Sequence, residues 1–329
     1  MIINIAFATQ PMRWLVVTVL LLAFASLGRA SEPPVRVLEP PVRIVATFSI
    51  LGDLVSQVGG NRLAVSLLAG PEEDAHVFQP TPAQATQVAQ ARLLFSNGLG
   101  FEGWMNRLLK STNFKGEHIV VTKGIAPLKP SSAGHSHGSR HGHSHGHQDP
   151  HAWQDVRNVL VYVKNIALGL CRVDRSGCPG YQINAERLTE SLNALHRDIE
   201  SSWAGIPKER RKVITSHDAF AYYEAAYQVQ FLSPQGVSTE AEASAKGVGR
   251  LIRQIKKEGI QALFVENISN ARLIEQIARE TGLKPSGELY SDALSKPGGP
   301  AMSYIDMMRH NTRLLTSAIN TTRAQGEKP

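Results

Sequence analysis

The sequence predicts an α/β protein of two lobes, each with a parallel sheet, joined by a long rigid connecting helix. Short β-branched runs alternate with helical patterns in the first half, and the same alternation returns in the second half. One long amphipathic pattern separates the halves. With 329 residues, 42% of them hydrophobic, the chain is long enough to build two globular lobes.

The first half contains runs of β-branched and apolar residues that predict strands, and a helical pattern over residues 49–60 that ends at a Gly-Gly pair. The expected strands cover residues 42–48, 62–70, 91–98 and 118–124. In the second half, strands are expected at 211–218 and 262–267, and helices at 218–228, 248–259, 271–282 and 302–319.

Between the halves, apolar residues recur at steps of three and four, which is typical of an amphipathic helix. They are Leu188, Leu192, Leu195, Ile199 and Trp203. We therefore expect an N-terminal lobe over 31–180, a connecting helix over 181–205 and a C-terminal lobe over 206–329.

The N-terminus has the features of a secretory signal peptide over residues 1–30. Arg13 precedes an apolar run over 14–27, and the small residues Gly28 and Ala30 precede the expected cut. This run is shorter than the about 20 apolar residues of a membrane span, although an uncleaved anchor is the alternative. Translation could start at Met1 or Met12. Cleavage would lower the formal charge by two, from +7 to +5.

The chain has two cysteines, Cys171 and Cys178, and neither lies near the expected cut, so a lipid anchor is not expected. In an exported protein they predict a disulfide worth about 2–3 kcal/mol. A zinc-ligand pair is the alternative, but their spacing is wider than that of a C-x₂₋₄-C knuckle. No cluster of basic residues alternates with aromatic ones, so nucleic-acid binding is not expected.

The segment 134–155 holds seven of the 12 histidines of the chain. Six of them have only small or polar neighbours, in a stretch whose Gly, Ser and Pro content predicts a flexible loop over 131–149. We expect these six to bind additional metal weakly. They are His135, His137, His141, His143, His145 and His147.

The seventh, His151, lies between a Pro and a strong helical pattern, which gives it a fixed direction. His76 follows an expected strand, His217 lies at the carboxyl end of another, and Asp292 lies in a loop before the last helix. Ligands of open α/β sheets bind outside the carboxyl ends of the strands. Three imidazoles and one carboxylate form a tetrahedral set suited to zinc.

Four protein ligands leave little room for a reactive water, and the chain has no H-E-x-x-H motif. These observations favour a binding site over an enzyme; a secreted zinc-dependent hydrolase is the alternative. Binding requires neutral imidazoles, so affinity should fall below about pH 6. The acidic residues Glu72, Glu73 and Asp74 could join the site or form a solvated turn, and Asp155 could orient a ligand or begin a helix.

Six segments resemble the zinc/manganese solute-binding proteins of ABC importers, the ZnuA/TroA-like group. They are "GPEEDAHVFQPTPAQ", "DPHAWQD", "TSHDAFAYY", "GVSTEAEASAKGV", "FVENISNARLIEQIARETG" and "LYSDALS". The resemblance covers about residues 42–319 and implies a metal between two α/β lobes. The implied ligands are His76 and His151 from the first lobe, and His217 and Asp292 from the second.

The resemblance also implies a periplasmic location, delivery of the metal to a membrane permease, and no enzymatic activity. Manganese-type members commonly have a glutamate where this chain has His217, and manganese favours oxygen donors. We therefore expect Zn²⁺ as the transported ligand, with manganese as the alternative. We expect the protein to be a monomer.

Overall fold

The structure is a computed structural model that describes residues 40–129, 148–260 and 262–326. Within these ranges, no helix is both long enough and apolar enough to cross a membrane. The expected signal peptide and the six histidines of the His-rich segment lie outside the described residues.

The N-terminal lobe is built on a parallel sheet with the strand order β2-β1-β3-β4. Its strands are β1 (Val42–Phe48), β2 (Leu63–Ala69), β3 (Leu93–Ser96) and β4 (Glu117–Val120). Side chains alternate along β1, so that Ile44 and Val45 belong to apolar clusters on opposite faces. The helices are α2 (Ser49–Gly59), α3 (Pro82–Gln90), α4 (Met105–Thr112) and α5 (Val156–Val173), with 3₁₀ turns at Gly60–Arg62 and Ala152–Gln154.

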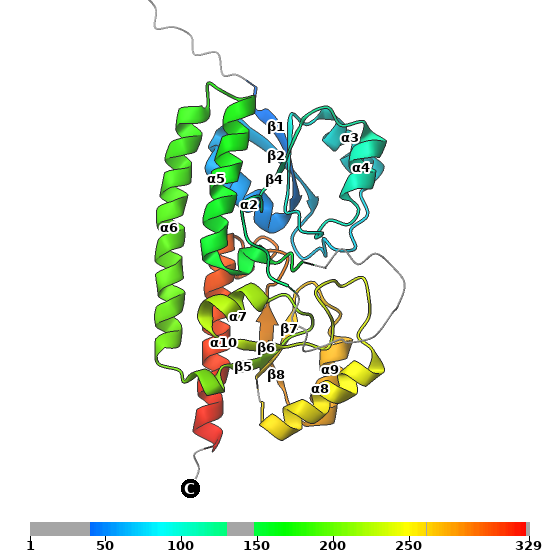
Figure 1. The fold of residues 1–329 in the computed structure, drawn as a ribbon, viewed down its shortest axis with the longest axis vertical. Helices are drawn as coiled ribbons and strands as arrows, with labels where there is room; N and C mark the ends of the chain where they lie inside the picture. The colour runs from blue at the N-terminus through cyan, green and yellow to red at the C-terminus, as the bar shows by residue number, and fades with distance from the viewer. Residues whose placement is uncertain (1–39, 130–147, 261, 327–329) are drawn as a thin grey trace, which may run out of the picture. The chain divides into compact units, whose positions relative to one another are not determined.

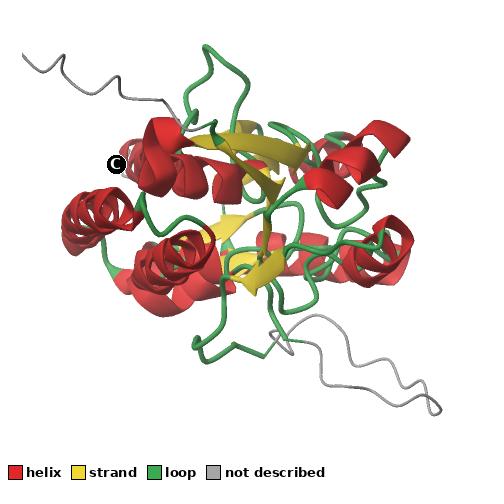
Figure 2. Cartoon of the chain, turned by 90° about the horizontal axis from the view of Figure 1, so that it is seen from above, coloured by secondary structure: helices red, strands yellow, loops and turns green. Residues whose placement is uncertain are grey.

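The C-terminal lobe repeats this topology with the order β6-β5-β7-β8, again parallel. Its strands are β5 (Lys212–Ile214), β6 (Gln230–Leu232), β7 (Ala262–Glu266) and β8 (Pro285–Leu289). Its helices are α7 (Ala221–Tyr227), α8 (Ala245–Glu258), α9 (Arg272–Thr281) and α10 (Tyr304–Gly326), and a 3₁₀ turn covers Lys208–Arg210. Figure 2 shows strands with helices on both sides, which confirms the predicted class of two parallel α/β lobes.

The connecting helix α6 covers Cys178–Ala204, so it begins three residues before the expected start. Its five predicted apolar positions are buried, the most exposed being Leu188 at 4%. Twenty-seven residues at about 1.5 Å each give a length of about 40 Å. The last helix, α10, packs beside α6 (Figure 1).

One continuous apolar cluster joins the two lobes. It includes Phe48 of β1, Leu192 of α6, Phe264 of β7 and Met307 of α10. Two smaller clusters lie on the other faces of the sheets, under α3 and α4 in one lobe and under α8 and α9 in the other. The lobes therefore share a core on the side of α6 and α10, while the opposite side of each lobe packs separately.

The predicted disulfide is present. Cys171, near the end of α5, is bonded to Cys178, the first residue of α6, with an S–S distance of 2.01 Å. At the same corner, the Arg62 guanidinium donates Nε to Asp174 Oδ2 at 2.9 Å. The hydrogen bond from Arg62 holds the pKa of Asp174 below its usual range.

Candidate metal centre

Three loops and one turn carry His76, His151, His217 and Asp292 to a common place between the lobes. His76 follows β2, and His217 follows β5 by three residues. His151 immediately precedes the 3₁₀ turn that leads into α5, and Asp292 follows β8. The structure brings all four together, with one candidate ligand atom from each residue within 4.8 Å of the others.

The ring nitrogens that face one another are the Nε2 atoms. His76 Nε2 lies 3.3 Å from His151 Nε2 and 3.3 Å from Asp292 Oδ2. His217 Nε2 lies 3.2 Å from Asp292 Oδ2, and His151 Nε2 lies 3.7 Å from Asp292 Oδ1. Ligands about 2.0–2.1 Å from a tetrahedral cation would be about 3.3–3.4 Å apart. The separations therefore suit one small cation at their centre.

The group is shielded from solvent. His151, His217 and Asp292 are fully buried, and His76 is 4% exposed. Among the described residues, the two carboxylate oxygens of Asp292 are buried and face the three Nε2 atoms, without a hydrogen bond from any other group. Because a buried carboxylate needs a positive charge to offset its desolvation, this arrangement favours a bound cation.

Two further carboxylates orient the histidines from behind. Asp149 Oδ1 lies 2.8 Å from His151 Nδ1, and Glu266 Oε2 lies 2.6 Å from His217 Nδ1. Each contact favours a proton on Nδ1 and leaves Nε2 to face the centre. Sequence reasoning missed both residues. Asp149 was close in sequence to His151, but Glu266 could be found only from the adjacency of β5 and β7.

The charges of the group are coupled. Burial works to lower the pKa of His151, but the charges of Asp292 and Asp149 outweigh it and raise the pKa to about 9. Burial opposes protonation of His217 too, yet Glu266 and Asp292 raise its pKa well above the usual value. Burial alone would raise the pKa of Asp292, but the two facing histidines hold it well below its usual range. A divalent cation would compete with protons for these nitrogens.

The two histidines of the N-terminal lobe share an Asp-x-His motif. In each case the aspartate Oδ1 accepts the backbone N–H of the histidine two residues later, at 2.9 Å for Asp74 and His76 and 2.9 Å for Asp149 and His151. This short-range hydrogen bond fixes the turn that carries the imidazole. Asp74 is thus a positioning residue and lies outside the group of four.

The other acidic residues considered from sequence have different partners. Glu72 pairs with Lys296, and Glu73 Oε2 accepts the backbone N–H of Gly70 at 2.6 Å. Asp155 caps the N-terminus of α5 by accepting the N–H of Arg157 at 2.9 Å, so Asp155 begins a helix and does not orient a ligand.

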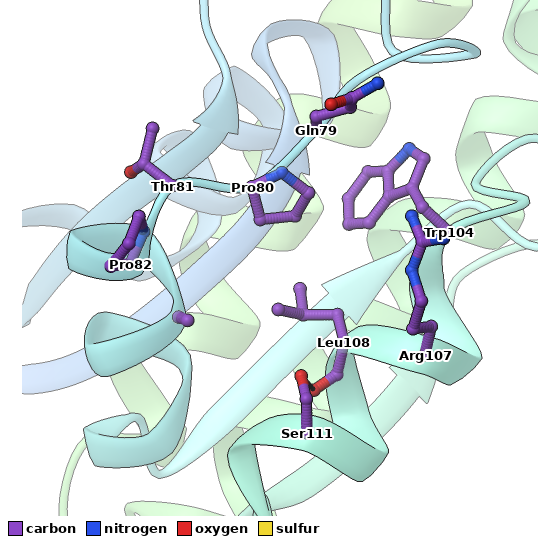
Figure 3. Close-up of a pocket in the computed structure, with 9 residues that line it drawn as sticks. Gln79, Pro80, Thr81, Pro82, Trp104, Arg107, Leu108 and Ser111 are labelled. Carbon is purple, nitrogen blue, oxygen red and sulfur yellow. Dashed lines mark hydrogen bonds between the residues drawn. The ribbon is translucent and has the colours of Figure 1, made fainter.

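A cavity of about 300 Å³ lies between α3 and α4 and is lined by Thr81, Trp104 and their neighbours (Figure 3). Its lining includes no member of the group of four.

Comparison with known proteins gives the family. The family described as zinc-uptake complex component A, periplasmic, matches residues 44–318. The chain belongs to this family. Its members are substrate-binding proteins of metal ABC transporters and not enzymes.

Individual relatives differ in the metal that their names give. The manganese-binding lipoprotein MntA of Halalkalibacterium halodurans is 30% identical over 280 residues, which cover 85% of this chain and 89% of MntA. The structure of the periplasmic zinc-binding protein TroA of Treponema pallidum is 26% identical, with a TM-score of 0.76 over 85% of this chain and 99% of TroA. The Mn-bound periplasmic metal-binding protein of candidatus Liberibacter asiaticus is 27% identical, with a TM-score of 0.73 over 84% and 98%.

Proposed function

We propose that the protein captures one Zn²⁺ ion between its lobes and delivers it to the membrane permease of an ABC importer. Zinc is here the transported substrate. The observation that supports this most strongly is the set of three Nε2 atoms and one carboxylate at separations of 3.2–3.7 Å, which suits a tetrahedral ion. The proposed ligands are His76, His151, His217 and Asp292.

Manganese is the second candidate, because MntA is named for manganese and one structural relative is described as Mn-bound. The donor chemistry favours zinc. Three nitrogens and one carboxylate form a borderline-soft set, while manganese is better suited by carboxylate, carbonyl and water oxygens. Glu72 and Glu73, which could have added oxygen donors, are engaged with Lys296 and Gly70.

The proposed location is the periplasm, after cleavage of the signal peptide over residues 1–30. Several relatives are named as lipoproteins. In this chain both cysteines are used by the disulfide, so neither offers a thiol for a lipid. The six histidines from His135 to His147 lie outside the described residues; their weak binding of additional zinc stays a prediction.

The direct test is an equilibrium titration of metal-stripped protein with Zn²⁺ and with Mn²⁺, each against a competing chelator. We expect one tight site with a preference for Zn²⁺. His217→Ala should weaken that site sharply, while His310→Ala should not, because His310 contacts the Glu288 carbonyl oxygen and lies outside the group. A tight site that survives His217→Ala would refute the ligand set, and a preference for Mn²⁺ would favour the second candidate.

A second test removes the segment Gly134–His147. We expect the number of zinc ions bound per protein to fall while one tight site remains, because the six histidines of this segment are predicted from sequence to bind only additional, weakly held zinc. Loss of the tight site would show that the segment is an integral part of it.

A further inference from the structure

A cation cannot reach the group of four unless the protein opens, because the most exposed member, His76, is 4% exposed. Separation of the lobes would break buried hydrogen bonds. Trp153 Nε1 and Gln154 Nε2 both donate to the Ser291 carbonyl oxygen at 2.9 Å, and the Tyr304 hydroxyl donates to the Trp153 carbonyl oxygen at 2.7 Å. It would also divide the continuous apolar cluster. A local opening at another point would therefore cost less.

A cavity of about 710 Å³ offers such a point. It lies between α8, α9 and the segment that connects β6 to α8, residues 233–244, which we call the β6–α8 segment. Its wall includes Ser216, which precedes His217, and Asp74, which precedes His76 by two residues. Three carboxylates and one guanidinium line it, which favours cations over anions; they are Asp74, Glu242, Glu280 and Arg272.

A hydrogen bond between two residues that line this cavity connects the two lobes. Thr239, in the β6–α8 segment, donates its hydroxyl to Asp74 Oδ2 at 2.6 Å. The other oxygen of the same carboxylate holds the backbone N–H of His76. Asp149, the counterpart of Asp74 in the second Asp-x-His motif, instead contacts the ring of its own histidine. Asp74 thus links the position of His76 to the opposite lobe.

The β6–α8 segment is held together by its own hydrogen bonds and is tied to the loop of His217 by the Asp218 N–H, which donates to the Gly236 carbonyl oxygen at 3.3 Å. The side chain of Gln235 donates to the carbonyl oxygens of Thr239 and Ala241, at 3.2 and 2.8 Å, so the segment keeps its own internal hydrogen bonds. Thr239 itself is only partly buried. Breaking its bond to Asp74 would leave both groups close to water and would not disturb the shared core.

We propose that the β6–α8 segment is a gate and that the Thr239–Asp74 hydrogen bond is its latch. The cation passes through the cavity beneath this segment to reach His76 and His217, and leaves by the same route. Thr239 and Asp74 act as positioning residues, because neither belongs to the group of four. This inference rests on the proposed function and adds the route that the metal takes.

The test is stopped-flow measurement of Zn²⁺ binding to metal-stripped protein, followed by tryptophan fluorescence, because the rings of Trp153 and His151 lie 5.3 Å apart. Thr239→Val removes the hydroxyl and keeps the shape. We expect the association and dissociation rate constants of Thr239→Val both to rise at least about tenfold. A hydrogen bond to a charged group shifts the equilibrium between closed and open forms towards the closed form by about tenfold or more, and this variant lacks that bond. The equilibrium dissociation constant should change less than about threefold, since the latch closes the gate with or without the ion.

Two controls keep the hydroxyl at position 239. Thr239→Ser should have the rates of the unmodified protein. Ser238→Ala removes a neighbouring hydroxyl that accepts the N–H of Glu240 and does not reach the other lobe, so it should also leave the rates unchanged. Thr239→Ala is a second variant with the same expectation as Thr239→Val, and thermal melting checks that each variant is folded.

Rates of Thr239→Val equal to those of Ser238→Ala would overturn the gate. A weaker affinity with an unchanged association rate would overturn it too, because the hydroxyl would then stabilise only the bound form. In both cases the unmodified protein would still bind one zinc ion, so the proposed function would stand. Absence of zinc binding by the unmodified protein would instead contradict the proposed function.

Discussion

Replacing Glu266 by glutamine tests whether the carboxylates behind the histidines set the metal affinity. Glu266 is fully buried, and its Oε1 accepts the backbone N–H groups of Ser216 and His217 at 2.7 and 2.8 Å. Its Oε2 lies 2.6 Å from His217 Nδ1. Glutamine keeps the size and one acceptor oxygen, but it removes the negative charge that makes His217 a stronger donor to a cation.

The expected loss of zinc affinity follows from the contact between Glu266 and His217 that the variant changes. Outer partners of metal-bound histidines are typically worth about 10- to 100-fold in affinity, which is about 1.4–2.7 kcal/mol. The charged contact here is short and fully buried, so we expect a loss within this range. The assay is competition with a chelator at a fixed pH, because zinc affinity depends on the protonation of the histidines.

The chain offers a matched control in Glu102. It is also a buried glutamate, and its Oε1 accepts the Asn97 N–H at 2.7 Å and the Thr47 hydroxyl at 2.6 Å. It contacts none of the four proposed ligands among its described partners. Glu102→Gln should leave zinc affinity unchanged. An unchanged affinity for Glu266→Gln, or an equal loss in both variants, would refute the reasoning.

Three other results are expected. Asp174→Asn should lower the free energy of unfolding by about 1 kcal/mol at pH 7, a modest value because the Arg62 side chain is 38% exposed to solvent. Because the Arg62 contact lowers the pKa of Asp174 in the folded protein, the difference in unfolding free energy should shrink below about pH 4. Denaturant unfolding at pH 7 and below pH 4 measures both effects. Replacing Cys171 and Cys178 by serine should lower the unfolding free energy by about 2–3 kcal/mol, and an unchanged melting curve would show that the disulfide does not constrain the unfolded chain. Zinc binding at pH 8 should release protons, because the pKa of His151 is raised to about 9; calorimetry in buffers of different ionisation enthalpy measures this release, and buffer-independent heats would contradict it.

The raised pKa of His151 also changes the pH range over which zinc affinity should decrease, compared with the range that the sequence alone predicts. An ordinary histidine pKa places the loss of affinity below about pH 6. The raised pKa of His151 moves the onset upwards, so that affinity should already decrease as the pH falls from about 9. The shift could not be found from the sequence, because it depends on which carboxylates face the buried ring.

The strands and helices with a strong apolar pattern could be predicted from the sequence. The runs that become β1, β2, β3, β4 and β7 are rich in apolar and β-branched residues, and the five apolar positions of α6 are all buried. The strand expected at 211–218 was too long, because β5 ends at Ile214 and His217 lies in the following loop. That shorter strand is what places His217 at the carboxyl edge of the sheet.

The elements that were missed have weak or mixed patterns. β6 has three residues, and β8 starts at Pro285 and contains Gly287, so neither shows strand periodicity. In α3 only Val88 is buried, which gives no apolar stripe. A usable signal was present there, since Thr81 and Gln84 form a capping box with Pro82 in the first turn.

The group of four could be proposed from sequence because His76 and His217 lie at or just after the carboxyl ends of expected strands, while His151 and Asp292 precede expected helices. The partners behind them could not, because hydrogen bonds between residues distant in sequence depend on strand order. Glu266 is 49 residues from His217, and Thr239 is 165 residues from Asp74. Only the folded chain brings these pairs together.

The most direct measurement is a crystal structure of the zinc-loaded protein with anomalous diffraction data collected on both sides of the zinc absorption edge. We predict one strong anomalous peak between the lobes, about 2.0–2.2 Å from the Nε2 atoms of His76, His151 and His217 and from a carboxylate oxygen of Asp292. A peak bound by other residues, or the absence of a peak between these four side chains, would contradict the account.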